Sequence, residues 1–454
     1  MPTRVIVLAA GLGKRMNSRS PKVLHSVAGK SMIEHVLDAA EPLSEKPPIV
    51  VHGINGDALK SKMSNRKIDW ILQKEQLGTG HAVLQALPLL NDSDLVLILC
   101  ADIPLIRNCT LKNLIDHAVD GDGFSILTVK LEQAGGYGRI FHDRLGYVVK
   151  IVETSDLKGK ESDTKECNSG IFAVKANLLK RWLPRLEKNN AQGELYLTDC
   201  VYFASSEGFP VSSLQIEDPS EAIGVNDRQQ LAIAERSFQK RVATELLKSG
   251  VTLLDPDRID VRGDLVCGPD VIIDVNAIFI GRVILGAGVY VGPNNVIKNT
   301  VIGEGSVVQE NCVLDSASIG SDCKVGPFCR LRPDTILSTG VTIGNFVEIK
   351  KTTIGEGSKV NHLSYVGDTE IGREVNIGAG TITCNFDGEN KNKTIIEDYV
   401  FVGSNTELVA PVTIGNGATI GAGSTVTKDV EDKTLVVSRA TQKSISDWKR
   451  PKKK

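Results

Sequence analysis

The sequence predicts a two-part chain of the α/β class, with a Rossmann-like, mostly parallel sheet in its first half and a parallel β-helix in its second. Three observations predict this arrangement. At 454 residues the chain is too long for a single compact core. Strand-like apolar runs alternate with helical patterns up to about residue 230. Beyond residue 251 this alternation gives way to a repeat of six residues.

The first half contains apolar runs and helical patterns in alternation. Val5–Ala10 predicts a strand, Met32–Ala40 a helix, and Asp94–Cys100 a second strand. The second strand is apolar on both faces, as a parallel sheet covered by helices on both sides requires. Alternation of this kind favours an open α/β fold.

A long helix marks the boundary between the two halves. Residues 229–248 predict one helix, and Gly250 is the residue type that ends helices. We therefore expect domains at 1–228 and 250–454, joined by a helical linker at 229–249.

The second half repeats aliphatic residues every six positions, as at Ile319, Val325 and Leu331, often with glycine following. Three hexapeptides form a unit of 17 or 18 residues. A period of six fits three short strands per coil, with each aliphatic residue stacked on its equivalent in the next coil. This predicts a parallel β-helix with a continuous core. The period does not fix the handedness, and crossover connections are ordinarily right-handed.

The repeat is interrupted once, between Thr383 and Ile396. The inserted residues 384–394 are polar and rich in turn formers. A loop that leaves a regular solenoid costs little entropy and usually carries function. We expect a site at this loop.

Composition and charge exclude other classes of protein. Hydrophobic residues make up 41% of the chain and charged residues 24%, an ordinary globular balance. No run reaches the roughly 20 apolar residues of a membrane span, and the apolar run Val5–Gly11 is too short for a secretory signal. A net charge of −2 gives no field that attracts nucleic acid. We expect neither membrane nor nucleic-acid binding.

The nine cysteines indicate a reducing compartment. They contain no Cys-x-x-Cys pair, and no histidine cluster accompanies them, so neither a zinc site nor a disulfide framework is expected. Reduced thiols favour the cytoplasm. The one basic cluster, residues 449–454, is either a solvated tail or a site for an anionic ligand such as a phosphorylated cofactor.

A glycine-rich turn directly after the first strand predicts an anion site. Gly11-Leu12-Gly13 places backbone N–H groups where they can hold phosphate oxygens. The turn is not a Walker A loop, and it lacks the third glycine of a dinucleotide fingerprint. Arg15 and Lys22 nevertheless concentrate positive charge beside it.

Two further features belong with this turn. Residues 73–82 form a second glycine-rich turn that enters a helix, and Asp102 follows the buried strand. Open α/β sheets bind ligands at the carboxyl ends of their strands, and a carboxylate there can hold Mg²⁺ against a triphosphate. Asp102 alone would more often be a capping residue before a turn.

Together these motifs resemble a known family. With Gly136–Arg139, Ile151–Glu153, Asn168–Ile171 and Gly224–Arg228, they are similar to those of the bacterial bifunctional N-acetylglucosamine-1-phosphate uridylyltransferases/glucosamine-1-phosphate N-acetyltransferases. The resemblance covers essentially the whole chain. Because hexapeptide-repeat proteins of this kind coil left-handed, it implies a left-handed β-helix.

The resemblance implies an N-terminal site for UTP and N-acetylglucosamine-1-phosphate. Arg15 and Lys22 would neutralise charge as the sugar phosphate attacks the α-phosphate, and Asp102 and Asn226 would bind Mg²⁺. The family commonly has an aromatic residue and a glycine before the metal-binding Asp, where this chain has Cys100-Ala101. The implied substrate-binding residues are Leu8, Ala9, Ala10, Gly11, Lys22, Gln73, Gly78, Thr79, Cys100, Ala101 and Asp102 with Asn226 for the nucleotide, and Gly138, Glu153 and Asn168 for the sugar.

The β-helix carries polar residues that its repeat does not need. A lone histidine on a strand is usually structural. Here His362 and Tyr365 are one coil from Arg332 and Lys350, and residues one coil apart stack, so these side chains are expected to converge beneath the inserted loop. The polar residues are Arg332, Lys350, His362, Tyr365, Asn376 and Asn385.

The resemblance implies that His362 is the general base that frees the amine of glucosamine-1-phosphate to attack acetyl-CoA. Arg332 and Lys350 would clamp the sugar phosphate. Phe386 stands beside the loop asparagine, where the family usually has Tyr. The remaining implied ligands are Tyr365, Asn376 and Asn385 for the sugar, and Ala379, Ser404, Ala422 and Arg439 for acetyl-CoA.

The resemblance also implies a homotrimer with acetyl-CoA between neighbouring coils, and a product, UDP-N-acetylglucosamine, that feeds cell-envelope synthesis. Two alternatives stay open. In one, the chain is a nucleotidyltransferase whose β-helix serves only assembly or regulation. In the other, the β-helix is a trimeric scaffold for other proteins, which would leave the basic residues without a role.

Overall fold

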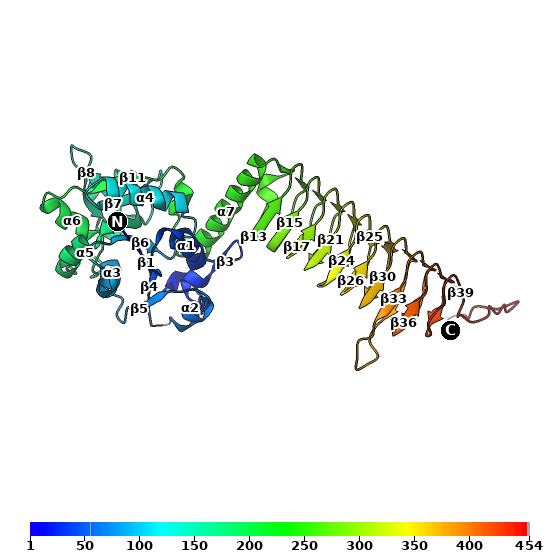
Figure 1. The fold of residues 1–454 in the computed structure, drawn as a ribbon. Helices are drawn as coiled ribbons and strands as arrows, with labels where there is room; N and C mark the ends of the chain where they lie inside the picture. The colour runs from blue at the N-terminus through cyan, green and yellow to red at the C-terminus, as the bar shows by residue number, and fades with distance from the viewer. Residues whose placement is uncertain (55, 452–454) are drawn as a thin grey trace. The chain divides into compact units, whose positions relative to one another are not determined.

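The computed structural model describes residues 1–54 and 56–451 and divides into two compact units, Met1–Phe238 and Gln239–Lys454 (Figure 1). The predicted fold class is confirmed in both. Unit 1 is an α/β domain with a mixed, mostly parallel sheet, and unit 2 is a left-handed parallel β-helix. Lys452–Lys454 of the basic tail lie outside the described residues.

The sheet of unit 1 runs in the order β11-β7-β10-β6-β1-β4-β5, and off this path β8 pairs with β10 and β9 pairs with β8. The neighbours of β1, namely β4 and β6, are parallel to it, whereas β10 runs antiparallel to β6 and β7. The strands are β1 (Thr3–Ala9), β4 (Ile49–His52), β5 (Asp69–Leu72), β6 (Leu95–Cys100), β7 (Phe124–Lys130), β8 (Arg139–His142), β9 (Val148–Val152), β10 (Glu166–Lys175) and β11 (Ser212–Gln215); β2 (Ser26–Val27) and β3 (Lys30–Ser31) pair separately.

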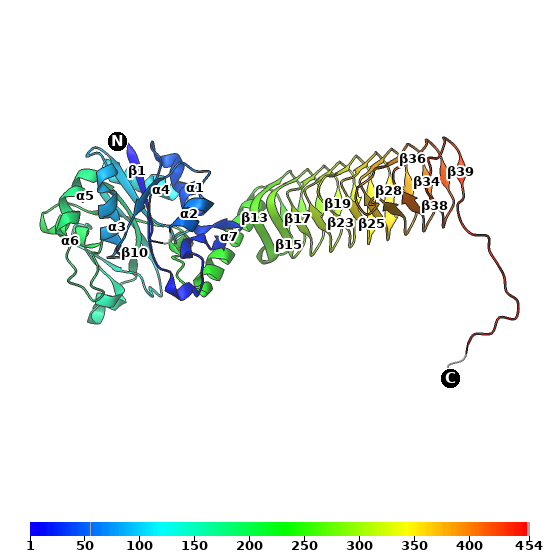
Figure 2. The ribbon, with the colours of Figure 1, turned by 90° about the horizontal axis from the view of Figure 1, so that it is seen from below.

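Helices cover both faces of this sheet (Figure 2). Leu95, Leu97 and Leu99 of β6 enter one buried cluster, while Val96 and Ile98 enter another. This alternation explains why the strand is apolar on both faces. The helices are α1 (Met32–Ala40), α2 (Asp57–Lys62), α3 (Thr79–Ala86), α4 (Asn108–Asp120), α5 (Ala176–Trp182), α6 (Asp199–Ser206) and α7 (Arg228–Lys248).

Helix α7 contains the boundary between the units. In unit 2, the Gln239 amide donates to Val261 O (2.9 Å) and accepts from Val261 N (2.8 Å), which satisfies the backbone of the first long strand. Gly250 follows the helix with φ +93°, the conformation of a helix-ending glycine. No helix in residues 1–54 and 56–451 is long and apolar enough to cross a membrane.

Unit 2 stacks short strands on the three faces of successive coils (Figures 1 and 2). Leu314, Leu331, Ile349 and Val366 are register partners in consecutive coils and are all buried. The six-residue period therefore places one aliphatic column on each face.

The first face holds β12 (Thr252–Leu253), β14 (Ile272–Ile273), β16 (Tyr290–Val291), β19 (Val307–Val308), β22 (Lys324–Val325), β25 (Thr342–Asn345), β28 (Lys359–His362), β31 (Asn376–Ile377), β34 (Phe401–Val402), β37 (Thr419–Ile420) and β39 (Leu435–Val436). The second holds β17 (Val296–Lys298), β20 (Val313–Asp315), β23 (Arg330–Leu331), β26 (Glu348–Lys350), β29 (Tyr365–Gly367), β32 (Ile382–Cys384), β35 (Glu407–Val409) and β38 (Thr425–Val426). The third holds β18 (Val301–Ile302), β21 (Ala317–Ile319), β24 (Thr335–Leu337), β27 (Thr353–Ile354), β30 (Thr369–Ile371), β33 (Thr394–Ile396) and β36 (Val412–Ile414), and β13 (Ile259–Cys267) and β15 (Ala277–Leu285) run across both of these faces.

The predicted interruption is a loop between β32 and β33 that projects from the coil (Figure 1). A bridge between Phe386 and Lys391 closes it. Inside, the Asp387 carboxylate accepts from Glu389 N (2.9 Å), Asn390 N (2.7 Å) and the Asn392 amide (2.9 Å). The backbone hydrogen bond from Asn390 is the largest of the causes that lower the pKa of Asp387. The loop is therefore an ordered turn.

Candidate functional site

A cavity of about 380 Å³ lies in unit 1, where β1 and β6 end. Most of the residues expected at the nucleotide line it. They are Leu8, Ala9, Ala10, Gly11, Lys22, Gln73, Gly78, Thr79, Cys100 and Asp102. The two glycine-rich turns, which are far apart in the sequence, thus line the same cavity.

Lys22 joins the two expected metal ligands. Its ammonium donates to Asp102 Oδ2 at 2.5 Å and to Asn226 Oδ1 at 3.0 Å. The Lys22 side chain is 10% exposed and that of Asp102 is 22% exposed. Two oxygens of the kind that Mg²⁺ prefers therefore point at one position, which a cation fills in this structure. Among the described residues, no three His, Cys, Asp or Glu side chains gather as a metal site.

Backbone geometry explains the glycine at position 78. Gly78 has φ +106°, and a Cβ added there would stand 2.6 Å from Leu195 O. A side chain is therefore excluded both by conformation and by space. The buried Gln73 side chain donates to Gly78 O at 3.2 Å, which holds the second turn against the strand end.

The residues that are expected to bind the sugar lie together beside the cavity and do not line it. Asn168 N donates to Gly138 O at 2.9 Å, and Asn168 Oδ1 accepts from Gly170 N at 3.0 Å. Glu153 accepts from the Thr198 hydroxyl at 3.1 Å, and burial raises its pKa. A Cβ on Gly138 would approach Glu153 Oε2 to 3.2 Å, so glycine keeps this carboxylate accessible.

Cys100 lies between these two groups. Its thiol is 3.6 Å from Gly170 O, and it also lines the cavity. Burial, and then the charge of Asp102, raise the pKa of Cys100 to about 12. The thiol is therefore neutral and unsuited to act as a nucleophile. Ala101 is buried, and its N–H donates to Leu8 O at 3.0 Å, so it joins strand ends.

The structure does not bring Arg15 to the cavity. Arg15 is exposed in a single helical turn at Lys14–Met16. Two polar residues that sequence reasoning missed also line the cavity, Gln76 and Glu194. Gln76 donates to Ala10 O at 2.6 Å, and its position inside the second glycine-rich turn was a signal that could have identified it.

In unit 2, one corner of the β-helix aligns His362 with residues expected at acetyl-CoA. Asn345 of β25 and His362 of β28 are register partners, and His362 Nδ1 is 3.0 Å from Asn345 Oδ1. Backbone hydrogen bonds extend this column, from Gly380 N to His362 O (3.2 Å), Asn405 N to Ala379 O (2.7 Å) and Gly423 N to Ser404 O (2.9 Å). His362, Ala379, Ser404 and Ala422 therefore occupy the same corner in successive coils, and Arg439 donates to Ala422 O at 2.6 Å.

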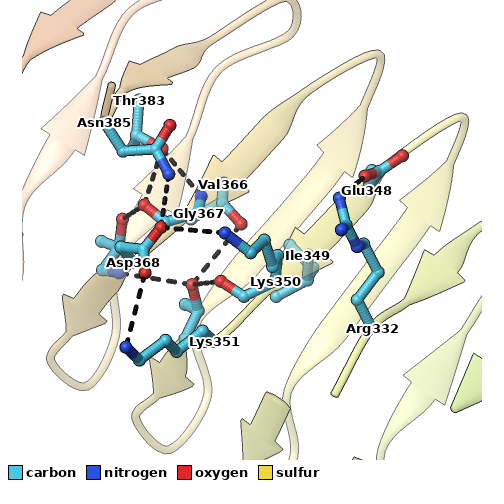
Figure 3. Close-up of polar contacts among 12 residues, drawn as sticks. Arg332, Glu348, Ile349, Lys350, Lys351, Val366, Gly367, Asp368, Thr383 and Asn385 are labelled. Atoms are coloured by element: carbon cyan, nitrogen blue, oxygen red, sulfur yellow. Dashed lines mark hydrogen bonds and ion pairs between the residues drawn. The ribbon is translucent and has the colours of Figure 1, made fainter. Parts of the chain in front are cut away.

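A second polar cluster lies at the adjacent face (Figure 3). Asp368 accepts from Asn385 Nδ2 at 2.5 Å and pairs with the Lys350 ammonium at 3.3 Å. A Cβ on Gly367 would stand 2.5 Å from the Tyr365 hydroxyl and 2.9 Å from Asn385 Nδ2. Lys350, Tyr365 and Asn385 therefore converge as expected, whereas His362, which was expected to join them, contacts Asn345 in the corner column.

The other expected residues of unit 2 lie near these groups. Arg332 pairs with Glu348 at 2.9 Å, and Glu348 is the register partner of Tyr365. Asn376 stands in β31 between Lys359 and Phe401 of neighbouring strands. The Phe386 ring is exposed on the loop.

Sequence reasoning missed Asn345, Glu348, Asp368 and Lys391. Each is about one coil from a predicted residue or belongs to the inserted loop, so counting 17 or 18 residues along the chain was the signal that could have found them. Lys391 faces Lys350, and this side-chain contact lowers the pKa of Lys391.

Comparison with known proteins agrees with this division. The MobA-like NTP transferase domain family matches residues 5–157. The GMPPB C-terminal domain family matches residues 261–343, and the bacterial transferase hexapeptide family matches residues 393–428.

Curated relatives match along the full length. The chain is 51% identical over 450 residues to the bifunctional protein GlmU of Aromatoleum aromaticum, which covers 99% of each chain. It is 50% identical over 452 residues to that of Marinobacter nauticus, covering 100% of this chain and 99% of the relative. It is also 50% identical over 447 residues to that of Alkalilimnicola ehrlichii, covering 98% and 96%.

Proposed function

We propose, since this chain belongs to the GlmU family of bifunctional transferases, that the residues assembled above carry its two reactions. The enzyme acetylates glucosamine-1-phosphate with acetyl-CoA in unit 2. It then transfers uridylyl from UTP to N-acetylglucosamine-1-phosphate in unit 1, releasing pyrophosphate and forming UDP-N-acetylglucosamine. The assignment of each reaction to named side chains rests on the geometry of the two units.

In unit 1, positioning and charge stabilisation perform the uridylyl transfer. The cavity at the ends of β1 and β6 accepts the nucleotide, and Glu153 and Asn168 hold the sugar beside Cys100. Lys22 places its positive charge at the phosphates. The phosphate oxygen of the sugar is already a nucleophile, so no covalent intermediate is required.

Mg²⁺ fits the two oxygens of Asp102 and Asn226, because both already contact a cation, the Lys22 ammonium. When bound, the ion supplies further charge neutralisation at the triphosphate. With these two oxygens held by the ion, Lys22 would be free to neutralise charge at the phosphates. Arg15, exposed in the turn Lys14–Met16, would neutralise charge on the triphosphate of a bound nucleotide.

In unit 2, His362 accepts the proton of the substrate amine. Its Nδ1 contacts Asn345 Oδ1 at 3.0 Å, and an amide oxygen accepts but cannot donate. Nδ1 therefore carries the hydrogen, and Nε2 keeps the lone pair that a base needs. The corner column of Ala379, Ser404 and Ala422 then receives acetyl-CoA alongside the base.

A trimer is supported by a stripe of large apolar residues beside this column. Phe328, Phe346 and Leu363 stand at corners of successive coils with φ of +54°, +55° and +48°, and they are 49%, 57% and 63% exposed. Bulky residues rarely adopt this conformation, and a contiguous exposed apolar patch marks an interface. Further copies of this chain would cover the stripe and lie next to His362. Sedimentation showing an active monomer would contradict the trimer.

A cytoplasmic location is supported by nine unpaired thiols, which suit a reducing compartment.

The corner column is the observation that carries the assignment of acetyl transfer, because it aligns the base with the acetyl-CoA residues. His362→Ala tests it. The variant should lose thiol release from acetyl-CoA and retain pyrophosphate release from N-acetylglucosamine-1-phosphate and UTP. Retained acetylation would refute the role of His362 as the base, and a wild-type chain that releases no thiol would leave unit 2 an assembly or scaffold role.

A further inference from the structure

Asp368 is a carboxylate at the centre of the second polar cluster (Figure 3). Its side chain is only 9% exposed. Oδ2 accepts from Asn385 Nδ2 (2.5 Å) and from Lys350 Nζ (3.3 Å), and Oδ1 faces Lys351 Nζ at 3.9 Å. One carboxylate thus contacts both a residue proposed to clamp the phosphate and a residue proposed to orient the sugar.

The backbone alone does not explain an aspartate here. Asp368 has φ +51°, a conformation that Asp and Asn tolerate well. Lys351, however, has φ +46° at the equivalent corner of the preceding coil. Its N–H donates to Pro333 O and that of Asp368 to Lys350 O, so both corners make the same kind of backbone bond. The backbone conformation at this corner therefore accepts other residue types, and it does not explain why position 368 carries a carboxylate.

The contact with Asp368 fixes the polarity of the Asn385 amide. An ionised carboxylate only accepts hydrogen bonds, so the amino group of Asn385 must face it. Figure 3 shows Nδ2 turned towards Asp368 and Oδ1 turned away. Asn385 therefore presents an oxygen to a ligand, and an acceptor is what the amine of glucosamine-1-phosphate requires.

The same carboxylate balances charge at the phosphate end. Lys350, Lys351 and Lys391 bring three ammonium groups to this cluster, because Lys350 and Lys351 face Asp368 and Lys391 lines one cavity with Lys351 and Asp368. Asp368 offsets one of these three charges. The remaining two match the dianion of a phosphate monoester. Lys350 uses one N–H for Asp368 and keeps two for the phosphate.

We propose that Asp368 is a positioning residue for acetyl transfer, which holds the Asn385 oxygen towards the substrate amine and Lys350 towards the substrate phosphate. This inference rests on the proposed acetyl transfer in unit 2.

Asp368→Asn removes the charge with little change of shape, and Asp315→Asn is the matched control. Asp315 pairs with Lys298 at 3.2 Å across the same face, near the start of the β-helix. Thiol release by the full chain is measured against each substrate in turn. Asp368→Asn should raise the KM for glucosamine-1-phosphate about tenfold or more and leave that for acetyl-CoA within about twofold. Asp315→Asn should match the wild type, and an Asp368→Asn variant that also matches it overturns the inference.

A double-mutant cycle with Asn385→Ala separates positioning from a general structural effect. If Asp368 acts through Asn385, Asp368→Asn should lose much of its effect in the Asn385→Ala background. Effects on kcat/KM that multiply independently contradict the proposal. Should Asp368→Asn fold poorly, Asp368→Glu restores the charge, and it should recover affinity for glucosamine-1-phosphate. A folded Asp368→Glu as impaired as Asp368→Asn also overturns it.

Calorimetric binding of glucosamine-1-phosphate separates this inference from the proposed function. A wild-type chain that releases no thiol refutes the proposed acetyl transfer. Weaker binding to Asp368→Asn than to Asp315→Asn would still support the positioning role, whereas equal binding would refute it.

Discussion

Replacing Lys22 by Met should tighten the binding of the metal ion and yet slow uridylyl transfer. The Lys22 ammonium lies 2.5 Å from Asp102 Oδ2 and 3.0 Å from Asn226 Oδ1, so at the proposed metal site it would compete with Mg²⁺ for the same two oxygens. Hydrogen bonds to charged groups contribute about 1.5–3 kcal/mol. Because Asp102 is 22% exposed, solvent weakens this contact. We therefore expect the substitution to strengthen metal binding by about 1.4 kcal/mol, which lowers the dissociation constant of the metal about tenfold.

The catalytic loss has the opposite sign. In the proposed reaction Lys22 stabilises charge at the phosphates in the transition state, and removing one such donor costs about 100-fold or more in kcat. Pyrophosphate release is measured against Mg²⁺ concentration at saturating UTP and N-acetylglucosamine-1-phosphate, and Mn²⁺ binding is measured by electron paramagnetic resonance without substrates. Thiol release in the same sample is the internal control. A weaker metal constant, or an unchanged kcat, would refute the reasoning.

Other substitutions test the remaining geometry. In Gly78→Ala the added Cβ would meet Leu195 O at 2.6 Å, which should cost about 1–3 kcal/mol of local strain. We expect kcat/KM for UTP to fall at least tenfold while thiol release is unchanged. A variant with normal UTP kinetics would contradict the close approach. Asn345→Ala should lower kcat for acetyl transfer about tenfold and leave KM for acetyl-CoA nearly unchanged, since it frees the His362 ring; equal rates would show that the contact is incidental. Ile349→Ala removes a fully buried member of the aliphatic column and should destabilise unit 2 by about 2–5 kcal/mol, seen by calorimetry as an earlier transition beside an unshifted one for unit 1. An unchanged thermogram would contradict that packing.

Much of the fold follows from periodicity. The helix expected at Met32–Ala40 is α1 with the same bounds, because Ser31 and Glu34 form a capping box at its start. The six-residue period predicted the β-helix and its extent, because each aliphatic residue of the repeat faces the core. Strand direction was not predictable in the same way. Strand β10 runs antiparallel to β6, but a buried strand has the same apolar pattern in either direction, so the sequence does not reveal its direction.

The sites were predictable where a residue type stands out against its repeat. His362 and Lys350 are polar interruptions of an apolar pattern, and the loop insertion marked Asn385. Asp368 and Asn345 were missed because they occupy corner positions, where polar residues are ordinary. Only the register between coils shows that these two contact the predicted residues.

The measurement that tests the account most directly follows free thiol and pyrophosphate together in one sample of purified protein with Mg²⁺, glucosamine-1-phosphate, acetyl-CoA and UTP. Two reactions in sequence on one chain predict that both products appear, and that pyrophosphate release stops when acetyl-CoA is left out. If N-acetylglucosamine-1-phosphate yields pyrophosphate while glucosamine-1-phosphate never yields thiol, the acetyl transfer assigned to His362 and its column is contradicted.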